Sequence, residues 1–295
     1  MNQTTTEITT QTLEAPGATL TYDVRPVDSS THPTLLLIGS PMGARGFATL
    51  ASHFTDRTVV TYDPRGADRS QRTDGGTQNT VEEQGDDVHR VIDAVGGGPV
   101  DIFASSGGAV NALELVARHP EQVHTLVAHE PPDAAILPDA DAVLAATRDI
   151  HDTYMSKGRS AGMAKFMALT SHTGELPGDW ADRPDPDPAM FGLPAEDDGS
   201  RDDPLLGMNM LTSPAYQPDF DALRAASTRI VLAAGEETTG QMANRGAFAV
   251  AGKLGTKPVI FPSHHGGFMG GEFGWPGKPD EFAAKLREVL DSSAT

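Results

Sequence analysis

The stretch that most constrains the fold of this chain is residues 98–117, because it changes from strand to helix over very few residues. Residues 99–104 form a short apolar run of strand length, and residues 109–118 carry apolar side chains at helical spacing. Only Ser-Ser-Gly-Gly lies between them. So short a connection must bend sharply, and the side chains two places before and after its apex must therefore be small.

Ser106 fits the apex of this bend better than Ser105. With Ser106 at the apex, the flanking residues are Ala104 and Gly108, the pattern small-x-Ser-x-small. Ser105 at the apex would instead push the phenyl ring of Phe103 into the bend. Such an elbow aims the hydroxyl out of the turn and places it at a helix N-terminus, which favours a nearby anion. We therefore predict Ser106 as a nucleophile, the alternative being a Gly/Ser loop without a catalytic role.

The charge balance and the lack of cysteine exclude several classes of function. Lys and Arg number 22 and Asp and Glu 41, a net charge of −19, which repels nucleic-acid phosphates and anionic lipids. We expect a small-molecule substrate, no nucleic-acid or membrane partner, and a chain that is free to form a homo-oligomer. Without cysteine there is no disulfide, thiolate zinc site or cysteine nucleophile. A polar N-terminal segment without an apolar core predicts a cytoplasmic protein.

Apolar strand-like runs alternate with helical patterns along both flanks of the chain. Residues 7–13 and 18–25 alternate in polarity around a Pro-Gly turn and predict an antiparallel hairpin. Further runs typical of buried strands occupy residues 34–38, 58–62, 99–104, 123–129, 228–234 and 258–261. Strand and helix in repeated succession predict an α/β fold with a doubly wound, mostly parallel sheet.

Residues 133–225 interrupt this alternation. They contain two helical patterns, followed by residues 174–204, which are rich in proline and acidic side chains and predict an exposed loop. We therefore predict a core made of residues 1–132 and 226–295, with a helical cap or lid inserted over one end.

Three motifs resemble those of the α/β-hydrolase-fold serine hydrolases, the class that includes esterases and lipases. The elbow A-S-S-G-G resembles the family's G-x-S-x-G, and G-S-P at residues 39–41 resembles its H-G-x-P turn, with Ile38 in place of the histidine. Y-D-P-R-G at residues 62–66 resembles a structural turn of the family. The resemblance covers both flanks but not the insertion, and it implies the α/β-hydrolase fold.

The resemblance also implies an oxyanion hole and a catalytic base. In the family, the residues after the glycine of the turn and after the nucleophile donate backbone N–H groups to the oxyanion, which here implies Ser40 and Gly107. A His-His pair follows the last predicted strand. The family's catalytic histidine precedes a small residue, which favours His265 over His264. A neutral imidazole there can accept the proton of Ser106.

The catalytic acid is where the sequence departs from the family pattern. Thr238 stands where most members carry an aspartate, three residues beyond Gly235. Glu237, or less favourably Glu236, lies beside that place and is one replacement. Glu130 is the other, because it follows the strand after the elbow helix, the place from which certain haloalkane dehalogenases take their acid. We predict Glu130 as the acid, with Glu237 as the alternative.

Together these features predict a carboxylesterase-like serine hydrolase that needs no cofactor or metal. It would cleave an ester, thioester or lactone of a small, hydrophobic substrate through an acyl-enzyme on Ser106. The insertion supplies an apolar wall for such a substrate, or only docks on the core, through Met155, Met163, Phe166, Met167, Phe191, Met208 and Met210. Two alternatives remain: a cofactor-free haloperoxidase or perhydrolase, and a noncatalytic ligand-binding member of the fold.

Overall fold

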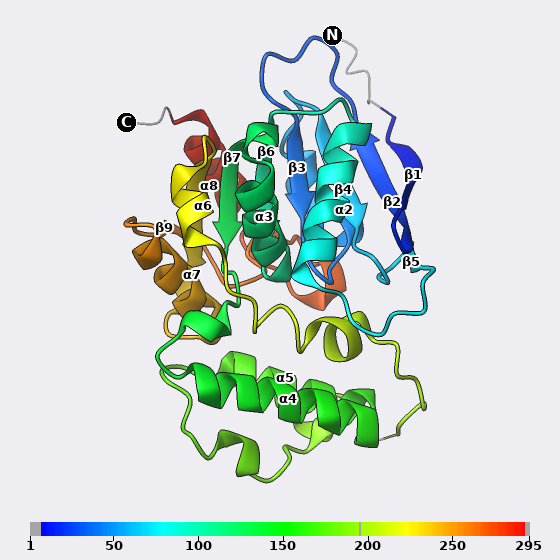
Figure 1. Cartoon of the computed structure of the whole chain (residues 1–295), viewed down its shortest axis with the longest axis vertical. Helices are drawn as coiled ribbons and strands as arrows, with labels where there is room; N and C mark the ends of the chain where they lie inside the picture. The colour runs from blue at the N-terminus through cyan, green and yellow to red at the C-terminus, as the bar shows by residue number, and fades with distance from the viewer. Residues whose placement is uncertain (1–6, 195, 293–295) are drawn as a thin grey trace.

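Nine strands form one sheet, in which parallel pairing predominates (Figure 1). This computed structural model describes residues 7–194 and 196–292. The strands are β1 (Thr9–Ala15), β2 (Ala18–Arg25), β3 (Leu35–Ile38), β4 (Val59–Asp63), β5 (Gln71–Arg72), β6 (Val100–Ser105), β7 (Val123–His129), β8 (Arg229–Gly235) and β9 (Val259–Phe261). Their order is β1-β2-β4-β3-β6-β7-β8-β9, with β5 paired to β2. Pairing is antiparallel around β2 and parallel from β4 onward, which confirms the predicted α/β fold.

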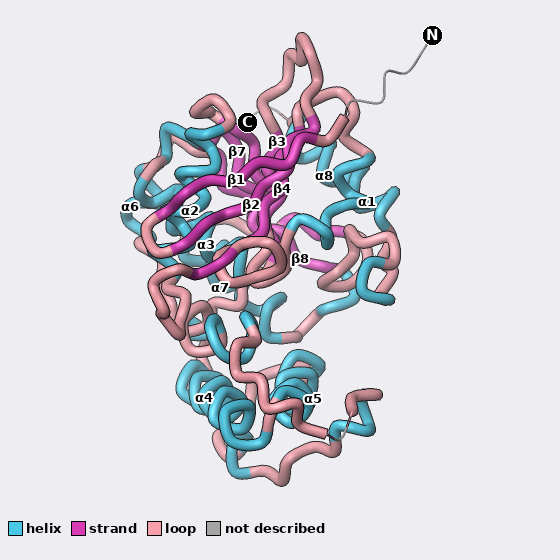
Figure 2. The backbone as a smooth tube through the Cα atoms, turned by 90° about the vertical axis from the view of Figure 1, so that its right-hand side faces the viewer, coloured by secondary structure: helices cyan, strands magenta, loops and turns pink. Residues whose placement is uncertain are grey.

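Helices cover both faces of this sheet. They are α1 (Ala48–Ser52), α2 (Val81–Ala94), α3 (Gly107–Arg118), α4 (Ala140–Lys157), α5 (Arg159–Ser171), α6 (Phe220–Ala225), α7 (Met242–Lys253) and α8 (Pro279–Asp291). Figure 2 shows α2, α3 and α6 on one side of the strands and α1 and α8 on the other. Helix α2 begins with a capping box: Thr80 and Glu83 each accept, through the side chain, a hydrogen bond from the other's backbone N–H.

Alternation along the strands divides the apolar side chains between these two layers. On β3, Leu36 and Ile38 belong to the cluster under α2 and α3, whereas Leu35 and Leu37 belong to the cluster under α1 and α8. All four side chains are fully or almost fully buried. Apolar residues on both faces are typical of a central parallel strand, and the sequence pattern at residues 34–38 is explained by this placement.

The helical segment after β3 is short. A 3₁₀ turn spans Ala44–Phe47, and only Ala48–Ser52 is α-helical. The backbone N–H of Ala44 donates to Oδ1 of Asp63 at 2.8 Å, so this segment begins with its backbone tied to the end of β4.

The helical insertion lies beyond the carboxyl ends of the parallel strands (Figure 1). Its helices α4 and α5 enclose an apolar cluster of their own, which includes Ile150, Tyr154 and Leu206. The predicted insertion includes α6, and Leu223 of this helix packs in the cluster under α2 and α3.

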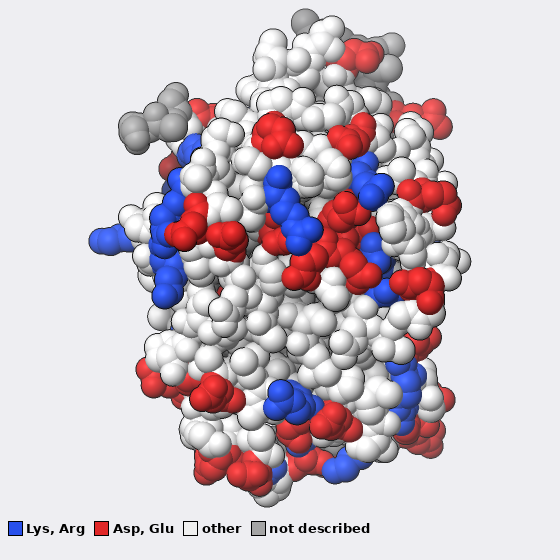
Figure 3. Space-filling model, in the orientation of Figure 1, with Lys and Arg blue, Asp and Glu red and all other residues white. Residues whose placement is uncertain are grey.

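Charged side chains are concentrated over the core and over the insertion, with an uncharged belt between them on the face in Figure 3. Many of the acidic residues of the loop after α5 pair with bases, as Asp185 does with Lys157 and Lys165. Within residues 7–194 and 196–292, no helix has both the length and the apolarity to span a bilayer.

Candidate active site

Ser106 occupies a sharp, strained turn between β6 and α3. Its backbone has φ +58° and ψ −130°, a conformation that non-glycine residues adopt rarely and at a free-energy cost of about 1–3 kcal/mol. The two glycines after it are needed for close packing. A Cβ on Gly108 would lie 2.7 Å from Cα of Gly39, and one on Gly107 would lie 2.6 Å from the carbonyl oxygen of Ser40. The small residues found in the sequence are therefore required by neighbouring backbone.

Ser105 and Ser106 have different environments. Ser105 is the last residue of β6, is buried, and forms a 3.1 Å hydrogen bond from its Oγ to Nδ1 of His129. Ser106 is partly exposed, and within the described chain its hydroxyl makes no hydrogen bond. Only the Ser106 hydroxyl is thus placed to react at the helix N-terminus.

The turn after β3 lies against the turn that carries Ser106. In the described ranges, the backbone N–H groups of Ser40 and Gly107 donate to no protein group, as donors of an oxyanion hole must. The Ser40 side chain is fixed from behind: its Oγ donates to Oε1 of Gln84 at 2.7 Å and accepts from Nδ2 of Asn209 at 3.2 Å. Asn209 thereby connects this turn to the end of the insertion.

Glu130 and His265 form a close pair at the carboxyl edge of the sheet. Nδ1 of His265, in the loop after β9, donates to Oε2 of Glu130 at 2.6 Å. Glu130 follows β7 directly, has φ +49°, and is fully buried. Within the described chain Nε2 of His265 makes no hydrogen bond, so this nitrogen is available to exchange a proton.

The second carboxylate oxygen of Glu130 is held by donors from the adjoining strand end and helix. Oε1 accepts from the Gly235 backbone N–H at 2.9 Å, from the Thr238 hydroxyl, and from Nδ2 of Asn244 at 3.5 Å. Thr238, which stands where most family members carry an aspartate, thus donates to the carboxylate of Glu130. No sequence motif pointed to Asn244 as a further donor.

The charge state of Glu130 follows from these contacts. Burial by itself raises the pKa of the carboxyl, but the hydrogen bond from His265, the neighbouring imidazoles and the Thr238 hydroxyl outweigh it and hold the pKa well below its usual range. Glu130 is therefore ionised at neutral pH. An ionised carboxylate at this place orients the imidazole and stabilises its protonated form.

The alternative acids and the neighbouring histidine face other groups. Glu237 and Glu236 are exposed and pair with Nζ of Lys278 at 2.7 and 2.9 Å. The ring of His264 stacks on Trp275 with ring centres 4.4 Å apart. Of the residues proposed from the sequence, the structure thus brings His265 and Glu130 together and leaves these three outside the site.

His129 lies beside this pair and was read from the sequence only as a core or surface group. It is fully buried, and burial lowers the pKa of its imidazole to about 4, so the ring is neutral. His129, Glu130 and His265 each offer one ligand atom, all within 4.8 Å of one another. Because Glu130 and His265 already share a hydrogen bond and aromatic rings enclose His129, the arrangement suits proton transfer better than metal binding.

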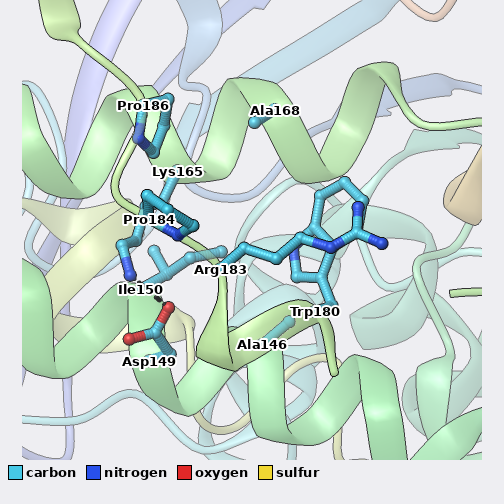
Figure 4. A pocket seen from close by; sticks show the side chains of 9 residues that line it. All are labelled: Ala146, Asp149, Ile150, Lys165, Ala168, Trp180, Arg183, Pro184 and Pro186. Atoms are coloured by element: carbon cyan, nitrogen blue, oxygen red, sulfur yellow. Dashed lines mark hydrogen bonds and ion pairs between the residues drawn. The ribbon is translucent and has the colours of Figure 1, made fainter. Parts of the chain in front are cut away.

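A cavity lies in the insertion and not at these residues. It has a volume of about 170 Å³ and lies between α4, α5 and the loop that follows them, with Trp180 and Arg183 on one side and Lys165 and Asp149 on the other (Figure 4). Lys165 is neutralised there by Asp149 and Asp185. None of the candidate catalytic residues lines this cavity.

Comparison with known proteins identifies related chains. The family described as alpha/beta hydrolase fold matches residues 33–189. The uncharacterized hydrolase YraK of Bacillus subtilis strain 168 is 31% identical over 293 residues, which cover 95% of each chain. The enol-lactonase of Burkholderia xenovorans LB400 has a similar structure, with a TM-score of 0.65, 15% identity, and coverage of 96% of this chain and 100% of that one. Proline iminopeptidase of Mycobacterium smegmatis gives a TM-score of 0.62, 18% identity, and coverage of 96% and 97%.

Proposed function

The chain belongs to the alpha/beta hydrolase fold family, and from this premise we propose that it is a serine hydrolase with Ser106 as nucleophile, His265 as base and Glu130 as acid. The observation that carries the proposal is the 2.6 Å hydrogen bond between His265 and the buried carboxylate of Glu130. The strained backbone of Ser106 supports it, because such strain concentrates at functional sites.

The proposed reaction has two halves. Ser106 Oγ attacks the substrate carbonyl while Nε2 of His265 takes the hydroxyl proton, and Glu130 stabilises the imidazolium. The N–H groups of Ser40 and Gly107 bind the oxyanion that forms. His265 returns the proton to the leaving group, and water then attacks the acyl-enzyme by the same steps and releases the acid.

We propose an ester, thioester or lactone of a small, apolar substrate as the bond that is cleaved. The belt between core and insertion on the face in Figure 3 carries no Lys, Arg, Asp or Glu, which suits an uncharged substrate. The methionines expected to form an apolar wall differ in placement: Met210 is buried among the insertion's apolar residues, whereas Met155 and Met167 are exposed. The similar structures include a lactonase and a peptidase, so matched ester and amide substrates are the direct comparison.

A fluorophosphonate probe with peptide mapping tests the proposal. The probe should label Ser106, and Ser106→Ala should abolish both labelling and hydrolysis of p-nitrophenyl acetate. Ser105→Ala should keep substantial activity. Hydrolysis that survives in Ser106→Ala, or failure of the folded wild-type protein to react with the probe, contradicts the proposal. A rate that depends on hydrogen peroxide would identify a perhydrolase with the same triad.

A further inference from the structure

His129 is a polar side chain in a place built for an apolar one. Its ring is fully buried, with ring centres 5.4 Å from Phe282, 5.8 Å from Phe103 and 6.3 Å from both Phe261 and Phe268. An unpaired polar group in such surroundings destabilises a fold, whereas a phenyl ring would not. The hydrogen bonds of His129 must therefore be considered.

The only side-chain partner of His129 in the described chain is Ser105, whose Oγ lies 3.1 Å from Nδ1. Nε2 has no partner there. Because the ring is neutral, it carries one proton. If Nδ1 carried that proton, it would donate to Oγ of Ser105, and the hydroxyl proton of Ser105 and the bare Nε2 would both lack a partner. The arrangement that satisfies more groups has the Ser105 hydroxyl donating to Nδ1 and the proton on Nε2.

This bond joins the two strand ends that carry the nucleophile and the acid. Ser105 ends β6 and immediately precedes Ser106, while His129 ends β7 and immediately precedes Glu130. The backbone N–H of Ser106 also donates to the His129 carbonyl oxygen at 2.9 Å. The side-chain bond thus fixes Ser106 relative to Glu130 by a second route.

The other face of His129 supports the base. The rings of His129 and His265 are 5.8 Å apart and inclined by only 27°, so they stack. The titratable groups that act on His129 are Glu130 and His265, and neither forms a hydrogen bond with its side chain. His129 therefore stacks on His265, directly precedes Glu130 in the chain, and is connected to Ser106 through its hydrogen bond with Ser105. It has no proton-transfer role in the proposed reaction.

We propose that His129 is a positioning residue. Its ring connects the strand of the nucleophile to the strand of the acid through Ser105, and it packs against the ring of His265. The inference rests on the proposed serine hydrolase function. The His129 side chain would contribute to positioning in two ways, through the hydrogen-bond acceptor Nδ1 and through its flat ring. Different substitutions remove these two features one at a time.

Two substitutions divide these contributions. His129→Phe keeps a ring but removes the acceptor, and the aromatic surroundings can accommodate it. His129→Asn keeps an acceptor near the place of Nδ1 but removes the ring. His129→Phe should lower kcat for p-nitrophenyl acetate and the rate of fluorophosphonate labelling by about fivefold, the value of the one hydrogen bond it removes. His129→Asn, which removes the ring that supports His265, should lower both by about tenfold to a hundredfold, because small displacements of reacting groups have effects of this size. KM should change little in either variant. The control is His124→Phe on the same strand, whose exposed ring bonds Asp101, and it should keep the wild-type rate.

A double-mutant cycle tests the bond itself. Ser105→Ala should slow the wild type and His129→Asn by a similar factor, about fivefold, as expected for one hydrogen bond. In the His129→Phe background it should have no further effect, since the bond is already absent. Equal, independent factors in all backgrounds, or lowered melting temperatures with unchanged kcat, would show that His129 only packs. Activity that survives in Ser106→Ala would instead overturn the proposed function, so the two failures are distinguishable.

Discussion

At the scale of single residues, Glu130 should matter far more than Glu237, although the sequence offers both. Glu130→Gln keeps the shape of the side chain and removes the charge that stabilises the imidazolium, so kcat for p-nitrophenyl acetate should fall by ~10⁴ with the fold intact. Glu237→Gln breaks only an exposed pair with Lys278 and should stay within about tenfold of wild type. Steady-state kinetics with circular dichroism as a fold check decides, and the reverse order would contradict the assignment of the acid.

Thr238 should contribute to catalysis through Glu130. Thr238→Val keeps the volume but removes a donor to Oε1 of the buried carboxylate, and hydrogen bonds to charged groups are worth about 1.5–3 kcal/mol. We expect kcat to fall by at least tenfold. Thr239→Val, next in the chain, removes a hydroxyl that bonds only the Glu236 carbonyl and should leave kcat unchanged. Similar rates in Thr238→Val and Thr239→Val would show that Glu130 needs no such support.

Sequence patterns distinguish the proposed residues best where the signature is local. Ser106 was distinguished from Ser105 by the size of its neighbours, which is a property of one short turn. The choice between Glu130 and Glu237 was not local, because it depends on which strand end the loop after β9 approaches and on Lys278 from the start of α8. In the sequence, Thr238 stands out only as a threonine where most family members carry an aspartate. Its hydrogen-bond partner becomes apparent only in the fold.

At the scale of elements, the turn between β6 and α3 tolerates no added side chain at Gly108. A Cβ there would meet the backbone of Ile38 and Gly39 at 2.7 Å, and backbone cannot yield as a flexible side chain can. We expect Gly108→Ala to lower the free energy of unfolding by about 2 kcal/mol or more, and to lower kcat as well. Gly252→Ala in α7 meets nothing within 4 Å and should stabilise the protein by about 0.5–1 kcal/mol. Urea titration of both variants makes the comparison, and equal stabilities would contradict this packing.

Periodicity predicted the strands more reliably than the helices. Buried strands here are apolar on both faces and end at clear turn residues. The segment after β3 has a helical pattern but begins tied to Asp63, which its pattern could not reveal. The short helix α6 was missed because it lies within the predicted insertion in sequence and packs in space with the sheet through Leu223.

At the scale of the whole molecule, the candidate site is assembled at one edge of the sheet. Its residues come from the ends of β3, β6 and β7 and from the loop after β9, all of which meet at the carboxyl ends of parallel strands. Binding and catalytic sites of α/β proteins form at this edge. The predicted topology was therefore enough to expect these residues close together. The insertion covers the same edge and begins just after Glu130 (Figure 1).

Asp133, at the start of the insertion, should make stability depend on pH. It is fully buried, and neither carboxylate oxygen has a hydrogen-bond partner in the described chain. Burial raises the pKa of Asp133 to about 8. Folding therefore keeps the carboxyl protonated while the unfolded chain ionises it near 3.8, so the free energy of unfolding falls as the pH rises between these values.

Asp133→Asn should remove this dependence. Between pH 5 and pH 7 the wild type should lose about 2.5 kcal/mol of unfolding free energy relative to the variant, because a protein that binds one proton more than its unfolded chain loses about 1.4 kcal/mol per pH unit. The quantity to measure is the pH-dependent difference in unfolding free energy between wild type and variant, by urea titration at both pH values. Asp182→Asn alters an exposed carboxylate and serves as the control, for which the difference should be near zero. A constant offset between Asp133→Asn and wild type at both pH values would mean that Asp133 ionises in the folded protein as readily as in the unfolded chain.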